Sequence, residues 1–168
     1  MSNTLKTERL TLRENRETDA AQIVEWRSNP EVYPYFKAPH ALTKEEHLRW
    51  YHHSYLTDAN RLDWLCLAAE TEKPVGVFGL RRISETPEVA EVSYLLAPEE
   101  QRKGYAAEAI RALIRHAAEA WDAQTVIAEI HKDNAPSVRL VEKLGFAFRK
   151  QTESFCVYVL DLEGQKEG

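Results

Sequence analysis

Six residues between an apolar run and an amphipathic segment constrain this chain more than any other part of it. The run at 89–96 reads as a strand, and Pro98 should end it because proline cannot donate a hydrogen bond to a sheet. After residues 101–106 (Gln-Arg-Lys-Gly-Tyr-Ala), apolar residues recur at helical spacing as far as Ala117. A loop of small residues that opens a helix directs free backbone N–H groups, and the positive end of the helix dipole, at one point. The sequence therefore predicts an anion site here, suited to a pyrophosphate.

The loop alone does not identify its ligand. An ordinary strand-to-helix turn that uses a helpful glycine would have a similar sequence. Two nucleotide-binding loops are excluded: no Gly-Lys-Ser/Thr ending marks a P-loop, and no G-x-G-x-x-G marks a dinucleotide fingerprint.

A second motif follows thirty residues later. Residues 134–146 (Asn-Ala-Pro-Ser-Val-Arg-Leu-Val-Glu-Lys-Leu-Gly-Phe) come directly after the strand-like run at 125–131. Together with residues 101–106, this segment resembles the acetyl-coenzyme A site of the GNAT N-acetyltransferases, in which Q/R-x-x-G-x-G/A precedes N-x-x-S/A…E-K-x-G-F. The resemblance extends from residues 8–13 (Glu-Arg-Leu-Thr-Leu-Arg) to the last strands.

The resemblance implies an enzyme that uses acetyl-CoA as co-substrate. It implies transfer of the acetyl group to a primary amine by direct attack in a ternary complex, without a covalent enzyme intermediate and without a metal. The acceptor would be a small-molecule amine or a peptide N-terminus.

Composition limits the other function classes. The chain has 168 residues, enough for one domain, with 43% hydrophobic and 29% charged residues. A net charge of −5 argues against nucleic acid as the main partner. No apolar run approaches the ~20 residues of a membrane span, and no signal region opens the chain, so we expect a cytoplasmic protein. Cys66 and Cys156 lie in strand-like runs and read as buried thiols. Both a monomer and a homodimer are compatible with the sequence.

The order of strand-like and helix-like segments along the sequence predicts an α/β chain. The resemblance adds a GNAT-like mixed, mostly antiparallel sheet that is flanked by helices and splayed around acetyl-CoA, between strands 89–96 and 124–131. Thr43 and Glu46 have the form of a capping box. The predicted strands are 8–13, 62–70, 75–83, 89–96, 124–131, 146–152 and 155–161, and the predicted helices are 17–28, 43–55, 105–121 and 135–144, the last ended by Gly145.

Several side chains near the two motifs could meet the phosphates of coenzyme A. Gly104 lets the backbone approach closely, and Ala106 keeps the start of the helix uncrowded. Arg102 and Lys103 add positive charge, although solvated loop residues are an equal alternative. Arg139 and Lys143 share one helix face and either meet the remaining phosphate or form an exposed basic face.

The resemblance also implies contacts with the pantetheine arm. The arm would pair with the edge of the strand at Leu95 to Ala97, and Asn134 would hydrogen-bond to it or order the site. An N-cap role for Asn134 is compatible with that contact. The predicted cofactor-binding residues are Leu95, Leu96, Ala97, Gln101, Arg102, Lys103, Gly104, Tyr105, Ala106, Asn134, Ser137, Arg139 and Lys143.

Glu91 is the candidate general base. Amide formation needs a neutral amine, and a lysine-like amine must first lose a proton at pH 7. Alternation along the strand places Glu91 on the face of Ser93 and Leu95, opposite Val92 and Tyr94. The carboxylate is either near the reacting centre or at a solvated sheet margin.

The proton donor for the leaving thiolate has several candidates. Many GNAT enzymes have tyrosine directly after the leucine of the second motif, but this chain has Val141. Ser137 stands where a branch that acetylates ribosomal-protein N-termini also has serine, although capping or packing would explain it too. Tyr94 and a bound water are the other candidates.

Residues 26–55 are crowded with aromatic and histidine side chains. The spacing of His47, His52 and His53 argues against a metal site. An aromatic wall around a small-molecule pocket fits better, although half of these rings could simply belong to the core. The predicted substrate-binding residues are Trp26, Arg27, Tyr35, Phe36, His47 and Trp50.

Within residues 26–55, the segment expected to bind the acceptor, the sequence resembles two GNAT branches. Residues 26–30 and 46–50 are similar to enzymes that acetylate the 4-amino group of nucleotide-linked amino sugars, where a base would stack on an aromatic ring and Arg27 or His47 could meet the diphosphate. The overall frame and Ser137 resemble the ribosomal-protein N-terminal acetyltransferases. We favour the amino sugar. An acyl-CoA-binding sensor without catalysis is an alternative of another class.

Overall fold

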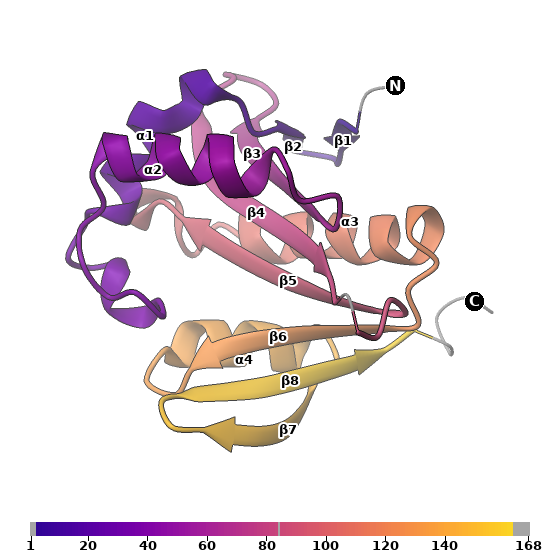
Figure 1. Cartoon of the computed structure of the whole chain (residues 1–168). Helices are drawn as coiled ribbons and strands as arrows, with labels where there is room; N and C mark the ends of the chain where they lie inside the picture. Colours follow the sequence, from indigo (N-terminus) through magenta and orange to yellow (C-terminus); the bar gives the residue numbers. More distant parts are fainter. Residues whose placement is uncertain (1–2, 84, 163–168) are drawn as a thin grey trace.

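The computed structural model describes residues 3–83 and 85–162 as one eight-stranded sheet with helices on both faces (Figure 1). The strand order is β1-β2-β3-β4-β5-β6-β8-β7. The strands are β1 (Leu5–Lys6), β2 (Leu10–Glu14), β3 (Arg61–Ala68), β4 (Pro74–Arg82), β5 (Val89–Leu96), β6 (Thr125–His131), β7 (Ala147–Thr152) and β8 (Phe155–Asp161). The α-helices are α1 (Ala20–Arg27), α2 (Lys44–Trp50), α3 (Tyr105–Ala120) and α4 (Ala135–Lys143).

The sheet is antiparallel except where β5 meets β6. These two strands pair in parallel from Val89 with Thr125 to Val92 with Ala128, and no further pair joins them within the described residues. Beyond this point the two strands diverge (Figure 1). The predicted splay between strands 89–96 and 124–131 is therefore confirmed.

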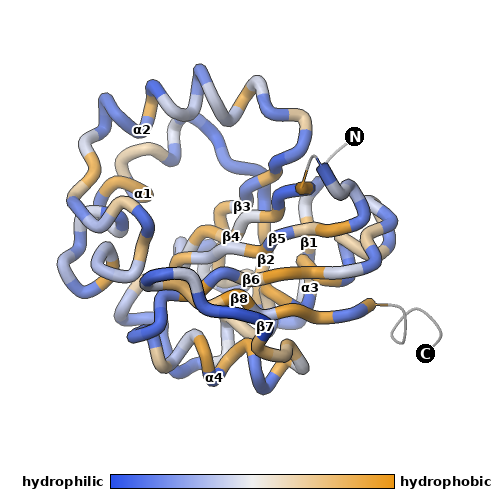
Figure 2. The backbone as a smooth tube through the Cα atoms, turned by 60° about the horizontal axis from the view of Figure 1, so that its bottom comes forward, coloured by the Kyte–Doolittle hydropathy of each residue, from blue (hydrophilic) through white to orange (hydrophobic). Residues whose placement is uncertain are grey.

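The two faces of the sheet carry different side chains. The main core lies between the sheet and α3 and α4, and it includes Ala90 and Val92 of β5 and Val126 of β6. A smaller cluster on the other face joins Trp26 of α1 to Leu95. Figure 2 shows hydrophobic residues concentrated in the strands, whereas α2 is mostly hydrophilic. Alternation thus puts the polar residues of β5 on the face that α1 and α2 cover.

Most predicted elements are present with shifts of one or two residues at their ends. Strands 89–96 and 155–161 have the predicted bounds, and the capping box of Thr43 and Glu46 is formed. The predicted helix 43–55 changes to a π-helical turn at Tyr51–Tyr55, where the rings of Tyr51 and Tyr55 stack 5.5 Å apart. The two-residue strand β1 escaped prediction because so short a run has no readable periodicity.

Gly76 fixes the close approach of β4 to β5. A Cβ atom at this position would lie 2.4 Å from the backbone oxygen of Leu95, which no side chain can tolerate without a shift of the strands. The residue pairs with Leu96 at the end of β5 that borders the splay.

Among the described residues, no helix is long and apolar enough to cross a membrane. Cys66 and Cys156 are both free and buried, as the sequence predicts.

Candidate active site

Glu91 stands one residue before the point where β5 and β6 separate. Its side chain is 18% exposed and lies on the α1/α2 face, as predicted. Arg81, its neighbour on β4, donates to the Glu91 Oε1 atom from Nη2 at 2.8 Å and from Nε at 3.3 Å. Both bonds end on Oε1, so the guanidinium does not occupy Oε2. The carboxylate is thus held in place at the sheet opening.

Tyr94 and Ser137 meet on the opposite face of the same opening. The Tyr94 hydroxyl lies 2.5 Å from the Ser137 Oγ atom of α4. The Tyr94 ring stacks on Phe78 with 5.7 Å between centroids, and Ser137 is only 8% exposed. Burial raises the pKa of Tyr94, and the hydrogen bond with Ser137 partly opposes that effect. The hydroxyl therefore keeps its proton at neutral pH and can donate it.

The residue at the usual tyrosine position has another role. Val141 is 1% exposed and packs in the main core. Two of the three candidate catalytic residues, Tyr94 and Ser137, are instead in direct contact, and they come from elements more than forty residues apart.

The loop before α3 has the geometry of an anion site. Gly104 is the N-cap of α3 with φ +82°, and no side chain caps the helix there. Arg102 is also left-handed, with φ +66°. The first N–H groups of a helix have no partner within it, so those of Tyr105 and Ala106 are directed at the space before the helix. The residues present fit a pyrophosphate.

A clamp from Arg9, the residue before β2, positions this loop, and no local sequence pattern predicted it. Arg9 Nη1 donates to the backbone oxygen of Lys103 at 2.8 Å, and its Nε donates to Glu108 at 2.8 Å. The Arg9 guanidinium also covers the Tyr105 ring at 4.7 Å. Burial acts to raise the pKa of Glu108, but hydrogen bonds from Thr7 and Arg9 outweigh it and keep the carboxylate charged. Arg9 belongs to the motif at residues 8–13. The sequence singled out this motif but did not indicate which residues Arg9 contacts.

One of the two predicted phosphate-binding lysines, Lys103, is held in an ion pair. Lys103 Nζ lies 2.9 Å from Glu100, a residue that is 3% exposed and also binds Lys73 at 2.9 Å. Lys143 lines a groove of about 660 Å³ between the C-terminal halves of α3 and α4, together with Arg111. Arg102 and Arg139 are exposed and keep their predicted role as candidates.

The pantetheine contacts need one correction. Asn134 occupies the N-cap of α4, but its side chain makes no capping hydrogen bond. Pro136 is the second helical residue and has no N–H to offer, which removes one of the usual partners. The Asn134 amide is therefore not committed to the cap. At the strand edge, both backbone groups of Ala97 already have partners: its N–H donates to the Val75 oxygen at 2.9 Å, and its carbonyl accepts from the Glu100 N–H at 2.9 Å.

The residues predicted to bind the acceptor lie on α1, on α2 and in the segment between these helices. Trp26 is 5% exposed and packs against Leu65 and Leu95, so it supports this face from within the core and a direct contact with an acceptor is not favoured. Four of the other predicted residues form two contact pairs. Arg27 covers the Phe36 ring at 4.5 Å, and His47 lies 5.5 Å from Trp50.

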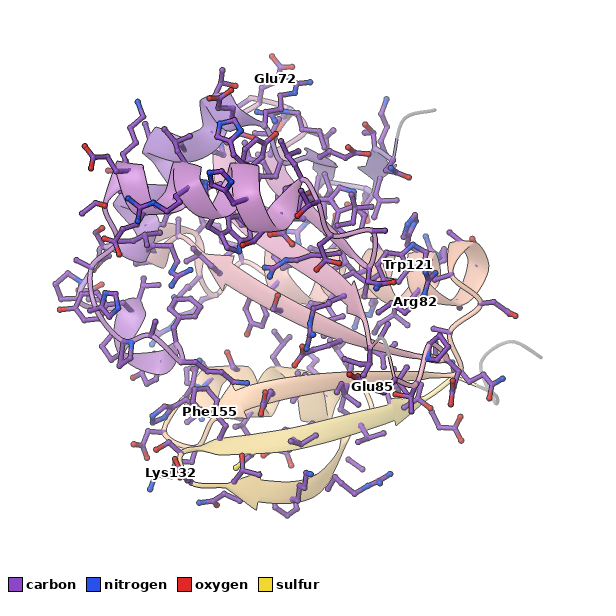
Figure 3. All side chains as sticks on the ribbon, in the orientation of Figure 1. Glu72, Arg82, Glu85, Trp121, Lys132 and Phe155 are labelled. Atoms are coloured by element: carbon purple, nitrogen blue, oxygen red, sulfur yellow. The ribbon has the colours of Figure 1, made fainter. Side chains whose placement is uncertain are left out.

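The loop after α1 reaches across the opening to β6 and β8. Lys37 Nζ lies 2.5 Å from Glu129, and the Tyr35 ring is 5.8 Å from His131. Lys37 also lies 5.7 Å from the ring of Phe155, which Figure 3 labels at the start of β8. No pattern in the sequence connected residues 35–37 with β6 and β8. The loop thereby closes one side of the acceptor face.

Comparison with known proteins identifies the family. A model of the GNAT acetyltransferase domain matches residues 9–147. The chain belongs to the GNAT acetyltransferase family. An uncharacterized N-acetyltransferase of Bacillus licheniformis, p20, is 30% identical over 147 residues, which are 85% of this chain and 82% of that protein.

Solved structures of GNAT enzymes share the fold. A spermidine N-acetyltransferase from Vibrio cholerae, in complex with CoA and spermine, has a TM-score of 0.82 at 20% identity and covers 92% of this chain and 96% of its own. The ribosomal L7/L12 α-N-protein acetyltransferase RimL, in complex with coenzyme A, has a TM-score of 0.82 at 16% identity, with 95% and 98% covered. At these identities the likeness concerns the fold.

No group of three or more histidine, cysteine, aspartate or glutamate side chains that could hold a metal occurs in the described part of the chain. His47 is 4% exposed, and burial, followed by the charge of Arg27, lowers its pKa.

Substitution of Gly104 by valine should weaken acetyl-CoA binding at least tenfold. A β-branched residue at φ +82° is strained, and its Cβ would lie 3.2 Å from Arg9 Nη2, so the loop must rearrange. Calorimetric titration measures the affinity. Gly145→Val is the matched control, because Gly145 has φ +98° at the far end of α4 and should cost stability without cost to affinity. Wild-type affinity in Gly104→Val would contradict the placement of the pyrophosphate.

Proposed function

We propose that this GNAT enzyme transfers the acetyl group of acetyl-CoA to the primary amine of a nucleotide-linked amino sugar. The observation that carries the proposal is the arrangement at the sheet opening. Glu91 lies on one face of β5, and the hydrogen-bonded pair Tyr94–Ser137 lies on the other, within three residues of the point where β5 leaves β6. A base and an acid thus flank one site from two sides.

The co-substrate would be held by the elements on the α3/α4 side. The backbone N–H groups at the start of α3, with Arg102, would bind the pyrophosphate. The edge of β5 at Leu95 and Leu96 would pair with the amide groups of the pantetheine arm, and Asn134 would donate or accept a further bond. The thioester of acetyl-CoA would supply an activated acetyl group at the opening.

Each residue then has one proton to handle. Glu91 accepts a proton from the ammonium form of the acceptor, directly or through a water, so that the nitrogen lone pair is free to attack the thioester carbonyl. A carbon–nitrogen bond forms, the carbon–sulfur bond breaks, and the nitrogen releases its second proton to water, which later reprotonates Tyr94. Tyr94 donates its proton to the departing sulfur, and Ser137 holds the Tyr94 hydroxyl in position. The Arg81 contact keeps Glu91 oriented throughout.

The amino sugar is favoured over a peptide N-terminus by the rings around the acceptor face. Tyr35 is 38% exposed, and Phe36 and Trp50 lie on the same side of the sheet, which suits a planar base. The buried Ser137, in contact with Tyr94, is compatible with both acceptors. The closed side formed by residues 35–37 fits a small molecule better than an extended chain.

Thiol release from acetyl-CoA tests the proposal when a panel of amines is offered. We expect turnover with nucleotide-linked amino sugars and little with polyamines or aminoglycosides. Turnover confined to peptides with a free Ser or Ala N-terminus would replace the proposed acceptor by a protein. Binding of acetyl-CoA without turnover on any amine would support the sensor instead.

Tyr94→Phe should lower kcat by about 10²-fold to 10⁴-fold with little change in the KM for acetyl-CoA, since it removes only the proton donor. Ser137→Ala should have a smaller effect because Tyr94 keeps its own proton. Tyr158→Phe is the matched control, since Tyr158 is a buried tyrosine of β8. Steady-state kinetics provide the readout. Full activity of Tyr94→Phe would assign the acid to another group.

Glu91→Gln should slow catalysis most at low pH. The acceptor is then mostly protonated and depends on a base, whereas at high pH the free amine needs none. The ratio of wild-type to variant kcat/KM, measured from about pH 6 to about pH 9, should fall as the pH rises. The exposed Glu119→Gln on α3 controls for loss of a carboxylate. A pH–rate profile that matches the wild type would exclude Glu91 as the base.

A further inference from the structure

Glu100 is a buried carboxylate that binds two lysine side chains at once. It ends the short 3-10 helix Pro98–Glu100, directly before the loop that opens α3, and its side chain is only 4% exposed. Lys73 Nζ lies 2.9 Å from the Glu100 Oε1 atom, and Lys103 Nζ lies 2.9 Å from Oε2. Hydrogen bonds from Lys103 and then from Lys73 hold the pKa of Glu100 below its usual value. The carboxylate is therefore ionised at neutral pH, and each of its oxygens holds one ammonium group.

The positive charges of this cluster outnumber the carboxylate that holds them. Two ammonium groups share one negative charge, so Lys73, Lys103 and Glu100 together keep one positive charge in excess. Glu99 also acts to raise the pKa of Lys73, but it is exposed to solvent, which screens its charge. The side chains of Lys73 and Lys103 are 59% and 49% exposed, and each ammonium has three N–H donors. The cluster can therefore bind a further anion from solvent.

The cluster lies beside the proposed pyrophosphate site. Lys103 directly precedes Gly104, the N-cap of α3, and Arg9 holds the Lys103 backbone oxygen at 2.8 Å. Lys73 comes from the turn between β3 and β4, and it is close enough to Tyr105, the first residue of α3, for Tyr105 to affect its pKa. Two segments that are distant in the sequence thus bring their ammonium groups to the start of α3.

Coenzyme A has a group that suits this cluster. Its pyrophosphate and its ribose phosphate are joined through a single ribose, so a protein that binds the first group at the start of α3 holds the second nearby. A phosphate monoester carries about two negative charges at neutral pH and has three acceptor oxygens. Two adjacent ammonium groups match it as point charges. The sequence offered Arg139 and Lys143 for this phosphate, but Lys143 lines the groove between the C-terminal halves of α3 and α4.

We propose that Lys73 and Lys103, fixed on the two oxygens of Glu100, bind the ribose phosphate of the co-substrate. The proposal rests on the proposed function, because the pyrophosphate at the start of α3 locates this phosphate. Lys73 belongs to neither sequence motif, and Glu100 acts as the residue that positions it. A cofactor without the ribose phosphate leaves the excess positive charge unbalanced, so the enzyme should select against such a cofactor.

Calorimetric titration of the whole chain with coenzyme A and with 3′-dephospho-coenzyme A tests the proposal. We expect the wild type to bind coenzyme A about tenfold more tightly than the dephospho form, or better. Lys73→Met should lose most of this preference, because it weakens the binding of coenzyme A and leaves that of the dephospho form unchanged. A purely structural role of Lys73 would weaken the binding of both forms. No acceptor is needed, so the result does not depend on the identity of the amine.

Two further variants are compared with Lys73→Met. Lys44→Met removes an exposed lysine at the start of α2 and should keep the wild-type preference. Arg139→Met tests the alternative on α4 and should keep the preference as well. Folding is checked by the thermal midpoint: Lys73→Met should melt near the wild-type temperature, because Glu100 still has Lys103 and the buried carboxylate stays paired.

Three results would overturn the proposal while coenzyme A still binds. These are equal affinity of the wild type for both forms, an undiminished preference in Lys73→Met, and a preference that is lost in Arg139→Met but kept in Lys73→Met. Failure of coenzyme A to bind, or wild-type affinity in Gly104→Val, would instead count against the proposed function, and this proposal would then be wrong with it.

Discussion

Beyond Val92, the backbone of β5 keeps its hydrogen bonds to β4, but within residues 3–83 and 85–162 no strand pairs with its other side. Inside a folded domain, such an edge leaves N–H and C=O groups that need a partner from elsewhere. An extended arm with amide groups can supply it. The positions of Glu91, Tyr94 and the first turn of α3 all depend on this opening, because each is carried by β5 or by the loop that follows it.

The opening also separates two electrical environments. On the α3/α4 side, the helix start and Arg102 offer positive partial and full charges without a built-in counter-ion. On the α1/α2 side, three ion pairs cancel their own charges, and Arg27 has no ion-pair partner among the residues that the structure describes. The co-substrate and the acceptor would therefore both bring anionic groups, held apart by the sheet, to a reaction centre where the ammonium form of the acceptor loses two protons and the departing sulfur gains one.

Local patterns were sufficient to predict most of the fold. Strand 89–96, the helix after Gly104 and the capping box of Thr43 are encoded by residues within a few positions of one another. Contacts between distant segments were not readable in this way. The Arg9 clamp on Lys103 and the Lys37–Glu129 pair join residues more than ninety positions apart, and no periodicity reports them. The missing cap at Asn134 has a local cause, the proline at the second helical position.

Amide hydrogen exchange with and without coenzyme A tests the central claim that the opening between β5 and β6 holds the co-substrate. Backbone amides of residues 93–96 and 104–107 should exchange more slowly in the complex, since the first group gains a partner at the strand edge and the second binds the pyrophosphate. Amides at the groove between the ends of α3 and α4, near Arg111 and Lys143, should be unaffected. Protection at that groove with no change in residues 93–96 would contradict the account.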